Sequence, residues 1–554
     1  MTESKKSLGT FDGVFTPSIL TILGVIMYLK LGWVVGNVGL SKALLIVTLA
    51  TSITFLTGLS IAAIATDQRV RAGGAYYMIS RSLGLEAGGA VGIPLFLAQA
   101  LSVSLYTVGF AESLIAVFPQ FDQESVVVVT IAIVACIALL SPKLAIRTQY
   151  LVMGVVGLSL VSLLFGKGVS TEVAGFSGTI EDPAGFWEVF SVFFPAVTGI
   201  TVGVNLSGDL KDPGRSIPLG TFLAVGVGYL VYMILPVILA FRASPDILVE
   251  DPLVMMPMSA WGQAILLGVW GGALSSAVGS ILGAPRVLQA LARDNVLPNG
   301  LSWLGRGTGD DDSPRIGTVV TLLFAGTAAY MTDLEVIAPI LTMFFLTTYG
   351  ALNIAAGLER ILKSPSFRPK FKVHWAFSFL GAIGCFSVMS LINSGATLVA
   401  LFFVIGVYIW LKKRALTVAW GDLRRGLWMA IIRAGLLGLK GEPDARNWRP
   451  YTLVFSGAPT RRWHLVDLAN CFSHSQGLLT VSTVVPEESI TLQRSKALES
   501  KIKDYLERRG VASLVRIISA PDAYSGVKRT VETYGVGPLV PNSVLLGQNY
   551  ELSK

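Results

Sequence analysis

Apolar stretches about as long as a membrane is thick recur along this chain of 554 residues. Each holds roughly 20 residues, which as a helix crosses a hydrocarbon core of about 30 Å. Because backbone groups find no water there, such stretches fold as packed helices. We expect a polytopic α-helical membrane protein with twelve spans, centred near Val25, Thr54, Leu105, Ala132, Leu158, Val197, Tyr229, Leu274, Leu323, Thr347, Ile383 and Val404.

The composition excludes a soluble multidomain enzyme. Hydrophobic residues make up 53% of the chain and charged residues 14%, and the mean hydropathy is +0.65. The amino terminus leads into a full-length span without a small-residue cleavage site, which argues against a removed signal peptide. The three cysteines, Cys136, Cys385 and Cys471, imply no disulfide framework.

Lys and Arg are distributed unevenly between alternate connections. If the amino terminus is cytoplasmic, the outer side keeps only Lys30, Lys42, Lys167 and Arg242. Cytoplasmic loops are enriched in Lys and Arg, so we expect both termini inside. The sequence pI of about 9.3 then calls for no nucleic acid, because the basic residues face the anionic inner leaflet.

The chain divides into segments of different composition. We expect a short cytoplasmic amino terminus over 1–13, a transmembrane transport domain over 14–414, an interfacial amphipathic helix and linker over 415–447, and a cytosolic domain over 448–554. In the last segment, β-branched runs at 451–457, 477–486, 512–519 and 543–547 alternate with helical patterns. This alternation predicts a small α/β domain with a largely parallel sheet. Its isolated glycines, Gly535 and Gly537, have the wrong spacing for a nucleotide loop, which favours a regulatory or dimerising module.

One predicted span contains residues that interrupt a helix. Residues 193–221 hold Pro195, which lacks a backbone donor, and Gly199 and Gly203, which lower helix propensity around Thr198 and Thr201. Unwound backbone at membrane depth is tolerated where it lines a protein cavity or binds a ligand. A kinked helix without a ligand is the alternative.

The first span holds a second break at the same depth, over residues 21–24. Spans one and six are where an inverted five-plus-five repeat places its discontinuous helices. Two facing breaks form one site, in which carbonyls bind cations and helix amino-terminal amides bind anions. No Asp, Glu or His interrupts the spans at that depth, which argues against a proton relay and for neutral ligands.

Seven stretches resemble a known family. They are GVIMYLKLGWVVGNVGL (24–40), GLSIAAIATDQRVRAGGAYYMISRSLG (58–84), YTVGFAES (106–113), FFPAVTGITVGVNLSGDLKDP (193–213), LSSAVGSILGAPRVLQALARDNVLP (274–298), FFLTTYGALN (344–353) and NWRPYTLVFSGAP (447–459). The chain resembles the cation-chloride cotransporters of the amino acid, polyamine and organocation superfamily. The resemblance implies twelve helices with an inverted repeat, transport rather than enzymatic activity, and no cofactor beyond the transported Na⁺, K⁺ and Cl⁻. It also implies a homodimer through the carboxy-terminal domain.

The resemblance also implies binding residues. The implied potassium ligands are the carbonyls of Thr21, Ile22 and Pro195 and the hydroxyls of Tyr106 and Thr198. The implied chloride ligands are the amides of Gly24, Val25 and Ile26 in one site, and the amides of Gly199, Ile200 and Thr201 with the Tyr349 hydroxyl in the other. The implied sodium ligands are the hydroxyls of Ser275 and Ser276 and the carbonyls of Leu20, Leu23 and Gly272. An extracellular gate would pair Lys30 with Glu112.

The motifs favour sodium-potassium-chloride symport. Sodium-dependent members share the LSSA motif at 274–277, and the sodium-chloride members carry His at the position of Tyr106. Thr21 and Leu23 replace the Asn and Trp typical of animal members, and Pro17 stands where those members have Arg, which makes a cytoplasmic gate through Asp294 doubtful. A long regulatory amino terminus is missing, which suggests a prokaryotic inner-membrane protein. The alternatives are potassium-chloride symport, an amino acid or amine permease, and a channel or sensor.

Overall fold

The computed structural model describes residues 8–67, 70, 73–140, 142–309, 312–331, 334–362, 367–414, 423–439, 448–473, 476–487 and 491–547. The chain separates into two compact units, Met1–Gly426 and Leu427–Lys554. The boundary between them falls within the predicted interfacial segment. There the structure has a helix, α18 (Leu423–Gly438), while residues 415–422 and 440–447 of that segment lie outside the described residues.

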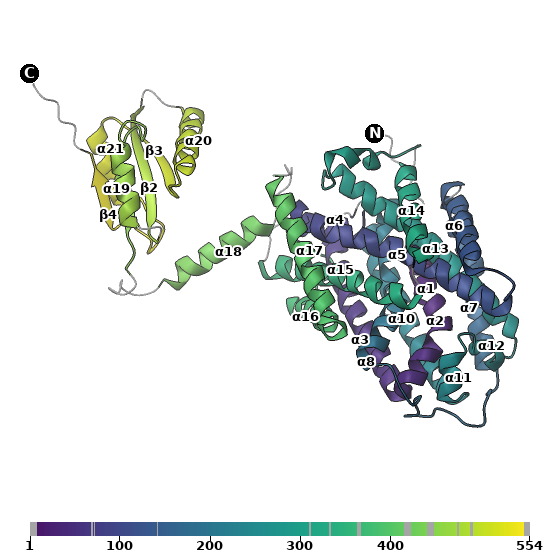
Figure 1. The fold of residues 1–554 in the computed structure, drawn as a ribbon. Helices are drawn as coiled ribbons and strands as arrows, with labels where there is room; N and C mark the ends of the chain where they lie inside the picture. The colour runs from purple at the N-terminus through teal and green to yellow at the C-terminus, as the bar shows by residue number, and fades with distance from the viewer. Residues whose placement is uncertain are drawn as a thin grey trace, which may run out of the picture. The chain divides into compact units, whose positions relative to one another are not determined.

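The first unit is helical (Figure 1). Its amino-terminal half contains η1 (Phe11–Phe15), α1 (Thr16–Ile22), α2 (Val25–Leu29), α3 (Leu31–Asp67), α4 (Ala75–Leu83), α5 (Leu85–Val117), α6 (Gln123–Leu140), α7 (Pro142–Leu164), α8 (Phe186–Phe193), η2 (Phe194–Val197), α9 (Ile200–Asn205) and η3 (Ser207–Asp209). The rest contains α10 (Pro213–Ala240), α11 (Pro245–Glu250), α12 (Met255–Met258), α13 (Gly262–Arg293), η4 (Asn299–Gly305), α14 (Arg315–Met331), α15 (Leu334–Leu362), α16 (Trp375–Ile392) and α17 (Ser394–Lys413).

Nine helices of the described residues are long and apolar enough to cross a membrane. The predicted spans near Ala132, Leu158 and Leu323 coincide with shorter apolar helices, Gln123–Leu139, Thr148–Leu164 and Arg315–Met331. The chain is therefore a polytopic membrane protein, and the number of twelve spans stays a prediction.

Burial separates central helices from peripheral ones. In the most apolar window of Phe11–Leu29, 89% of the residues are buried, and for Phe186–Asp209 the share is 100%. The corresponding share for α17 is 6%. A lipid-facing helix exposes apolar side chains at no cost, whereas a buried helix must fit its neighbours. The two segments that contain the predicted breaks thus form the centre of the unit.

A buried polar network fixes α15 against α3 and α16. The Asn353 amide donates to Thr57 Oγ1 at 2.9 Å, and its Oδ1 accepts from Ser60 at 2.7 Å. Ser60 also lies 3.0 Å from the Ser378 hydroxyl. Because interhelical hydrogen bonds join membrane helices, this network sets the position of Tyr349, one turn earlier on α15.

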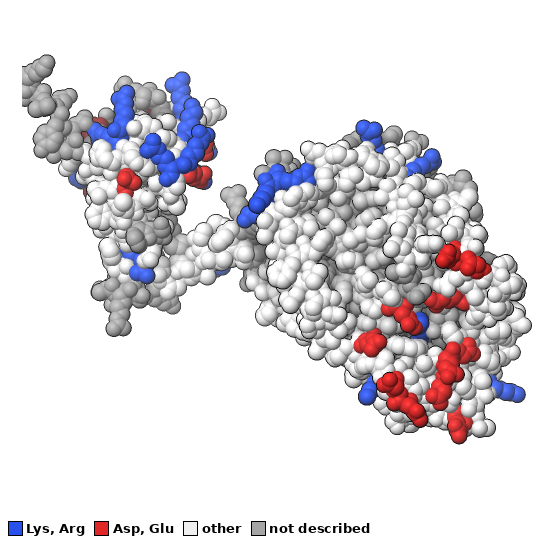
Figure 2. All heavy atoms as spheres, viewed as in Figure 1, with Lys and Arg blue, Asp and Glu red and all other residues white. Residues whose placement is uncertain are grey.

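Acidic and basic side chains gather at different ends of the first unit. On the face drawn in Figure 2, acidic side chains are concentrated, with a few basic ones among them, at the end where α11 and α12 lie in Figure 1, whereas the charged side chains seen at the opposite end are basic. Connections predicted to be outer and inner thus differ in charge, as the sequence pattern indicates.

The second unit contains a four-stranded parallel sheet of order β3-β2-β1-β4. Its strands are β1 (Tyr451–Phe455), β2 (Leu478–Pro486), β3 (Leu514–Ala520) and β4 (Ser543–Leu546), and its helices are α19 (Trp463–Ser473), α20 (Leu492–Arg508) and α21 (Ala523–Thr533). Parallel strands are buried by helices, and Val454 and Val481 have no exposed surface.

Candidate functional site

The first membrane helix is interrupted between α1 and α2. α1 ends at Ile22, Leu23 leaves the helical region with φ −88° and ψ 37°, and Gly24 is extended with φ −90° and ψ −153°. The first backbone bond of the new helix runs from the Met27 amide to Gly24. Among the described residues, the amides of Gly24, Val25 and Ile26 therefore have no backbone acceptor. This end of α2 thus presents three amides that are available as hydrogen-bond donors.

The sixth predicted span is interrupted at a 3₁₀ turn, η2, between α8 and α9. The Pro195 carbonyl accepts bonds from the Thr198 amide at 3.2 Å and the Thr198 hydroxyl at 2.8 Å. The Thr201 amide donates to the Thr198 carbonyl at 3.3 Å. The amides of Gly199 and Ile200 have no backbone acceptor in the part of the chain that the structure describes. Of the three amides predicted to bind chloride here, those of Gly199 and Ile200 are therefore available, whereas the Thr201 amide is already bonded.

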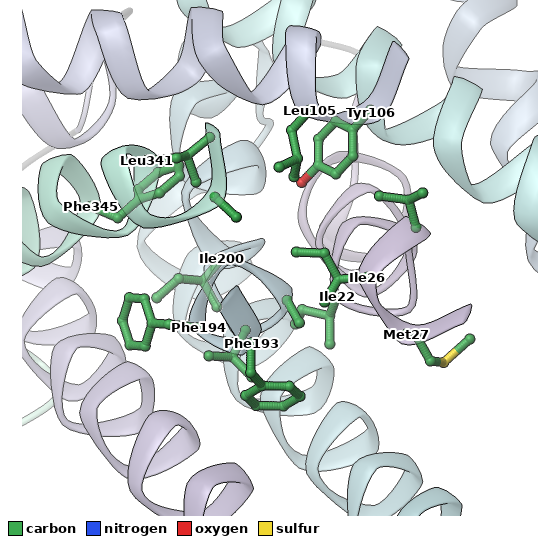
Figure 3. Close-up of a cluster of buried hydrophobic side chains, with 14 of the residues drawn as sticks. Ile22, Ile26, Met27, Leu105, Tyr106, Phe193, Phe194, Ile200, Leu341 and Phe345 are labelled. Atoms are coloured by element: carbon green, nitrogen blue, oxygen red, sulfur yellow. The ribbon is translucent and has the colours of Figure 1, made fainter. Parts of the chain in front are cut away.

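The two breaks lie against each other. A Cβ atom on Gly199 would lie 2.8 Å from the Ser18 carbonyl oxygen and 3.0 Å from the Ile22 amide nitrogen. A Cβ atom on Gly203 would lie 2.8 Å from the Ser18 hydroxyl. Only residues without side chains permit this approach of two backbones. Figure 3 shows Ile22 and Ile26 of the first break in one cluster with Ile200 of the second.

Three buried tyrosines contact or face the breaks. Tyr349 of α15 donates to the Thr198 carbonyl at 2.9 Å. Tyr106 of α5 is 4% exposed, and its hydroxyl points into the cluster that holds Ile26 and Leu341 (Figure 3). Tyr232 of α10 donates to the Ile22 carbonyl at 2.6 Å. Sequence reasoning missed Tyr232, because nothing in its apolar surroundings distinguishes it from a core tyrosine.

The predicted sodium residues also come together. The Ser276 hydroxyl donates to the Leu20 carbonyl at 3.2 Å. The Ser275 hydroxyl is buried and has no hydrogen-bond partner among the residues that the structure describes. A Cβ atom on Gly272 would lie 3.6 Å from the Leu23 carbonyl oxygen. A buried hydroxyl without a partner leaves its oxygen lone pairs unused.

Lys30 has a partner that the sequence did not indicate. Its ammonium lies 2.9 Å from the carboxylate of Glu335, in the first turn of α15. The predicted pairing of Lys30 with Glu112 stays a prediction. Asp294, which the sequence made doubtful as a gate residue, accepts a 2.7 Å bond from the Tyr76 hydroxyl. Arg286, two turns before Asp294 along α13, forms an ion pair with Asp209 at 2.7 Å.

The helices on either side of the two breaks contain almost no charged side chains. Within Thr16–Ile22, Val25–Leu29, Phe186–Phe193 and Ile200–Asn205, the only carboxylate is Glu188, in the first turn of α8. Carbonyl and hydroxyl oxygens can replace the hydration shell of a monovalent cation, and free amides can replace that of an anion. The arrangement therefore suits ions that shed water, and it offers no acid-base pair for catalysis.

Comparisons with known proteins identify related transporters. A family model described as amino acid permease matches residues 13–453, and one described as solute carrier family 12 matches residues 462–552. Human solute carrier family 12 member 2 is 31% identical over 97% of this chain and 50% of its own length. The Squalus acanthias member 2 is also 31% identical, over 97% and 51%, and the mouse member 1 is 29% identical, over 97% and 55%. The chain spans about half the length of the curated relatives it matches.

Proposed function

Because the chain belongs to the cation-chloride cotransporters within the amino acid permease family, we propose that it is a symporter that couples Na⁺, K⁺ and Cl⁻. The observation that carries the proposal is the pairing of two interrupted helices, one of which presents three free amides next to free carbonyls. Facing breaks that bind ions of both signs allow cations and chloride to move together without net charge.

Potassium binding is proposed at the carbonyls of Thr21, Ile22 and Pro195 with the hydroxyls of Tyr106 and Thr198. The Thr198 hydroxyl donates its proton to the Pro195 carbonyl and keeps its own lone pairs as acceptors. Because the Pro195 carbonyl also accepts from the Thr198 amide, one of these two bonds must open for that carbonyl to bind the ion. A cage of neutral oxygens suits a large, weakly hydrated cation.

Chloride binding is proposed at two places. The amides of Gly24, Val25 and Ile26 form the first, and those of Gly199 and Ile200 with the Tyr349 hydroxyl form the second. The Thr201 amide joins the second set only if its bond to Thr198 opens. Free amides at a helix amino terminus carry a partial positive charge, which supports an anion without a basic side chain.

Sodium binding is proposed at Ser275, Ser276, Leu20, Leu23 and Gly272. The unpartnered Ser275 hydroxyl supports it, because a buried polar atom without a partner costs free energy that a bound cation would recover. We further propose twelve spans in an inner membrane, both termini in the cytoplasm, and a homodimer formed through the carboxy-terminal domain.

The test is ion replacement during rubidium uptake into proteoliposomes. We expect uptake to require chloride and sodium. Uptake that needs chloride but ignores sodium would favour potassium-chloride symport. Uptake that ignores chloride would contradict the proposal and favour a permease or a channel.

A further inference from the structure

Tyr232 holds a backbone group at the first break. It lies on α10 with no exposed surface, and its hydroxyl donates at 2.6 Å to the carbonyl oxygen of Ile22. Ile22 is the last residue of α1, so this carbonyl lacks the amide that a continuing helix would offer it. Among the side chains of the described residues, Tyr232 alone donates a hydrogen bond to this carbonyl.

The same helix also holds the side chain of Ile22. Gly228 lies one turn before Tyr232, and a Cβ atom there would lie 2.6 Å from Cγ2 of Ile22. The ring of Tyr232 is in turn fixed by Phe193 of α8, which packs edge-on against it with ring centroids 5.2 Å apart. Ile22 is thus held by α10 at both its carbonyl and its side chain.

We propose that Tyr232 is a positioning residue that sets cation selectivity through the Ile22 carbonyl. The proposal rests on the proposed function, in which this carbonyl binds potassium. A carbonyl oxygen has two lone pairs, so a bond from Tyr232 leaves one for an ion. The bond fixes the oxygen and withdraws part of its electron density. A fixed oxygen of weaker field favours a large, weakly hydrated cation over a small one.

The first test replaces Tyr232 by Phe, which removes only the hydroxyl. Chloride-dependent uptake of radioactive rubidium is measured in proteoliposomes with competing potassium, caesium, ammonium and lithium. We expect the KM for rubidium to rise about tenfold, as for loss of one buried hydrogen bond. The order of competing cations should move toward smaller ions, while the maximum rate changes little. Tyr229→Phe is the matched control, because its half-buried hydroxyl lies 3.4 Å from Thr48 Oγ1 instead.

A second pair of variants tests the contact between Gly228 and the Ile22 side chain. Gly228→Ala places a methyl group against Ile22 and should shift selectivity in the same direction. Gly226→Ala, half a turn earlier on α10, meets no atom within 4 Å and should behave as the unmodified protein. Because both changes act through Ile22, the Tyr232→Phe, Gly228→Ala double variant should show less than the sum of the two single effects.

The outcomes separate this role from the proposed function. If the unmodified protein shows no chloride-dependent rubidium uptake, the proposed function and the role of Tyr232 are both overturned. A second outcome would overturn only the role of Tyr232. In it, the unmodified protein shows normal uptake, and Tyr232→Phe keeps the cation order of the unmodified protein but loses maximum rate and thermal stability. If Tyr232→Phe does not fold, the comparison of Gly228→Ala with Gly226→Ala decides, and equal selectivity in the two contradicts the proposal.

Discussion

The Tyr349 hydroxyl donates its proton to the Thr198 carbonyl at 2.9 Å, and so joins α15 to the second helix break. One hydroxyl proton cannot be donated to a carbonyl and to chloride at once. If chloride binds there, the bond to Thr198 must open, and the Thr198 carbonyl then keeps only its bonds from the Thr201 amide and hydroxyl. Chloride binding in the proposed mechanism therefore changes the contact between α15 and the second helix break.

Removing that hydroxyl should weaken chloride binding. In Tyr349→Phe, the ring keeps its contacts with Phe194 and Phe345, whose centroids lie 6.4 and 6.1 Å away. We expect the chloride concentration for half-maximal rubidium uptake to rise about tenfold. Tyr28→Phe is the control, because it loses a buried bond to Ser159 outside the proposed ligands. An unchanged chloride dependence in Tyr349→Phe would remove Tyr349 from the site.

The potassium ligands are tested at Tyr106 and Thr198. Tyr106→Phe and Thr198→Ala each remove one hydroxyl and should weaken apparent rubidium binding by roughly 1 to 3 kcal/mol. The measurement is the rubidium concentration dependence of uptake at saturating chloride. If both variants keep the affinity of the unmodified protein, the hydroxyls are not ligands.

The outer gate is tested by exchanging charges. Lys30→Glu should impair transport, and combining it with Glu335→Lys should restore part of the rate, because the pair at 2.9 Å is rebuilt in reverse. The effect should be modest, since Glu335 is 64% exposed and surface pairs contribute about 0 to 1 kcal/mol. The parallel exchange with Glu112→Lys tests the pairing expected from the family. Rescue by Glu112→Lys alone would assign the gate to Glu112 and count against Glu335.

Sodium coupling is tested at the paired serines of α13. Replacing Ser275 and Ser276 together by Ala should abolish the sodium dependence of rubidium uptake while leaving the fold intact, because small residues keep the helices close. Ser280→Ala, one turn further along α13, is the matched control. Persistent sodium dependence in the double variant would place the sodium site elsewhere.

The two helix breaks could be predicted from the sequence because Pro195, Gly199 and Gly24 act locally on backbone conformation. Their meeting at one place is what an inverted repeat with discontinuous first and sixth helices predicts. The bonds from Tyr232 to Ile22 and from Lys30 to Glu335 join residues far apart in the chain, and no local pattern distinguishes these residues from others of their type. Such pairings depend on how the helices pack, which a single sequence does not reveal.

In the proposed mechanism, chloride and cations move together without net charge. The most direct measurement is rubidium accumulation driven by an inward chloride gradient in proteoliposomes whose membrane potential is set by a pH gradient and a proton ionophore. We predict accumulation that requires the chloride gradient and stays the same at every imposed potential. Accumulation that follows the potential, or that persists when gluconate replaces chloride, would contradict electroneutral cation-chloride cotransport.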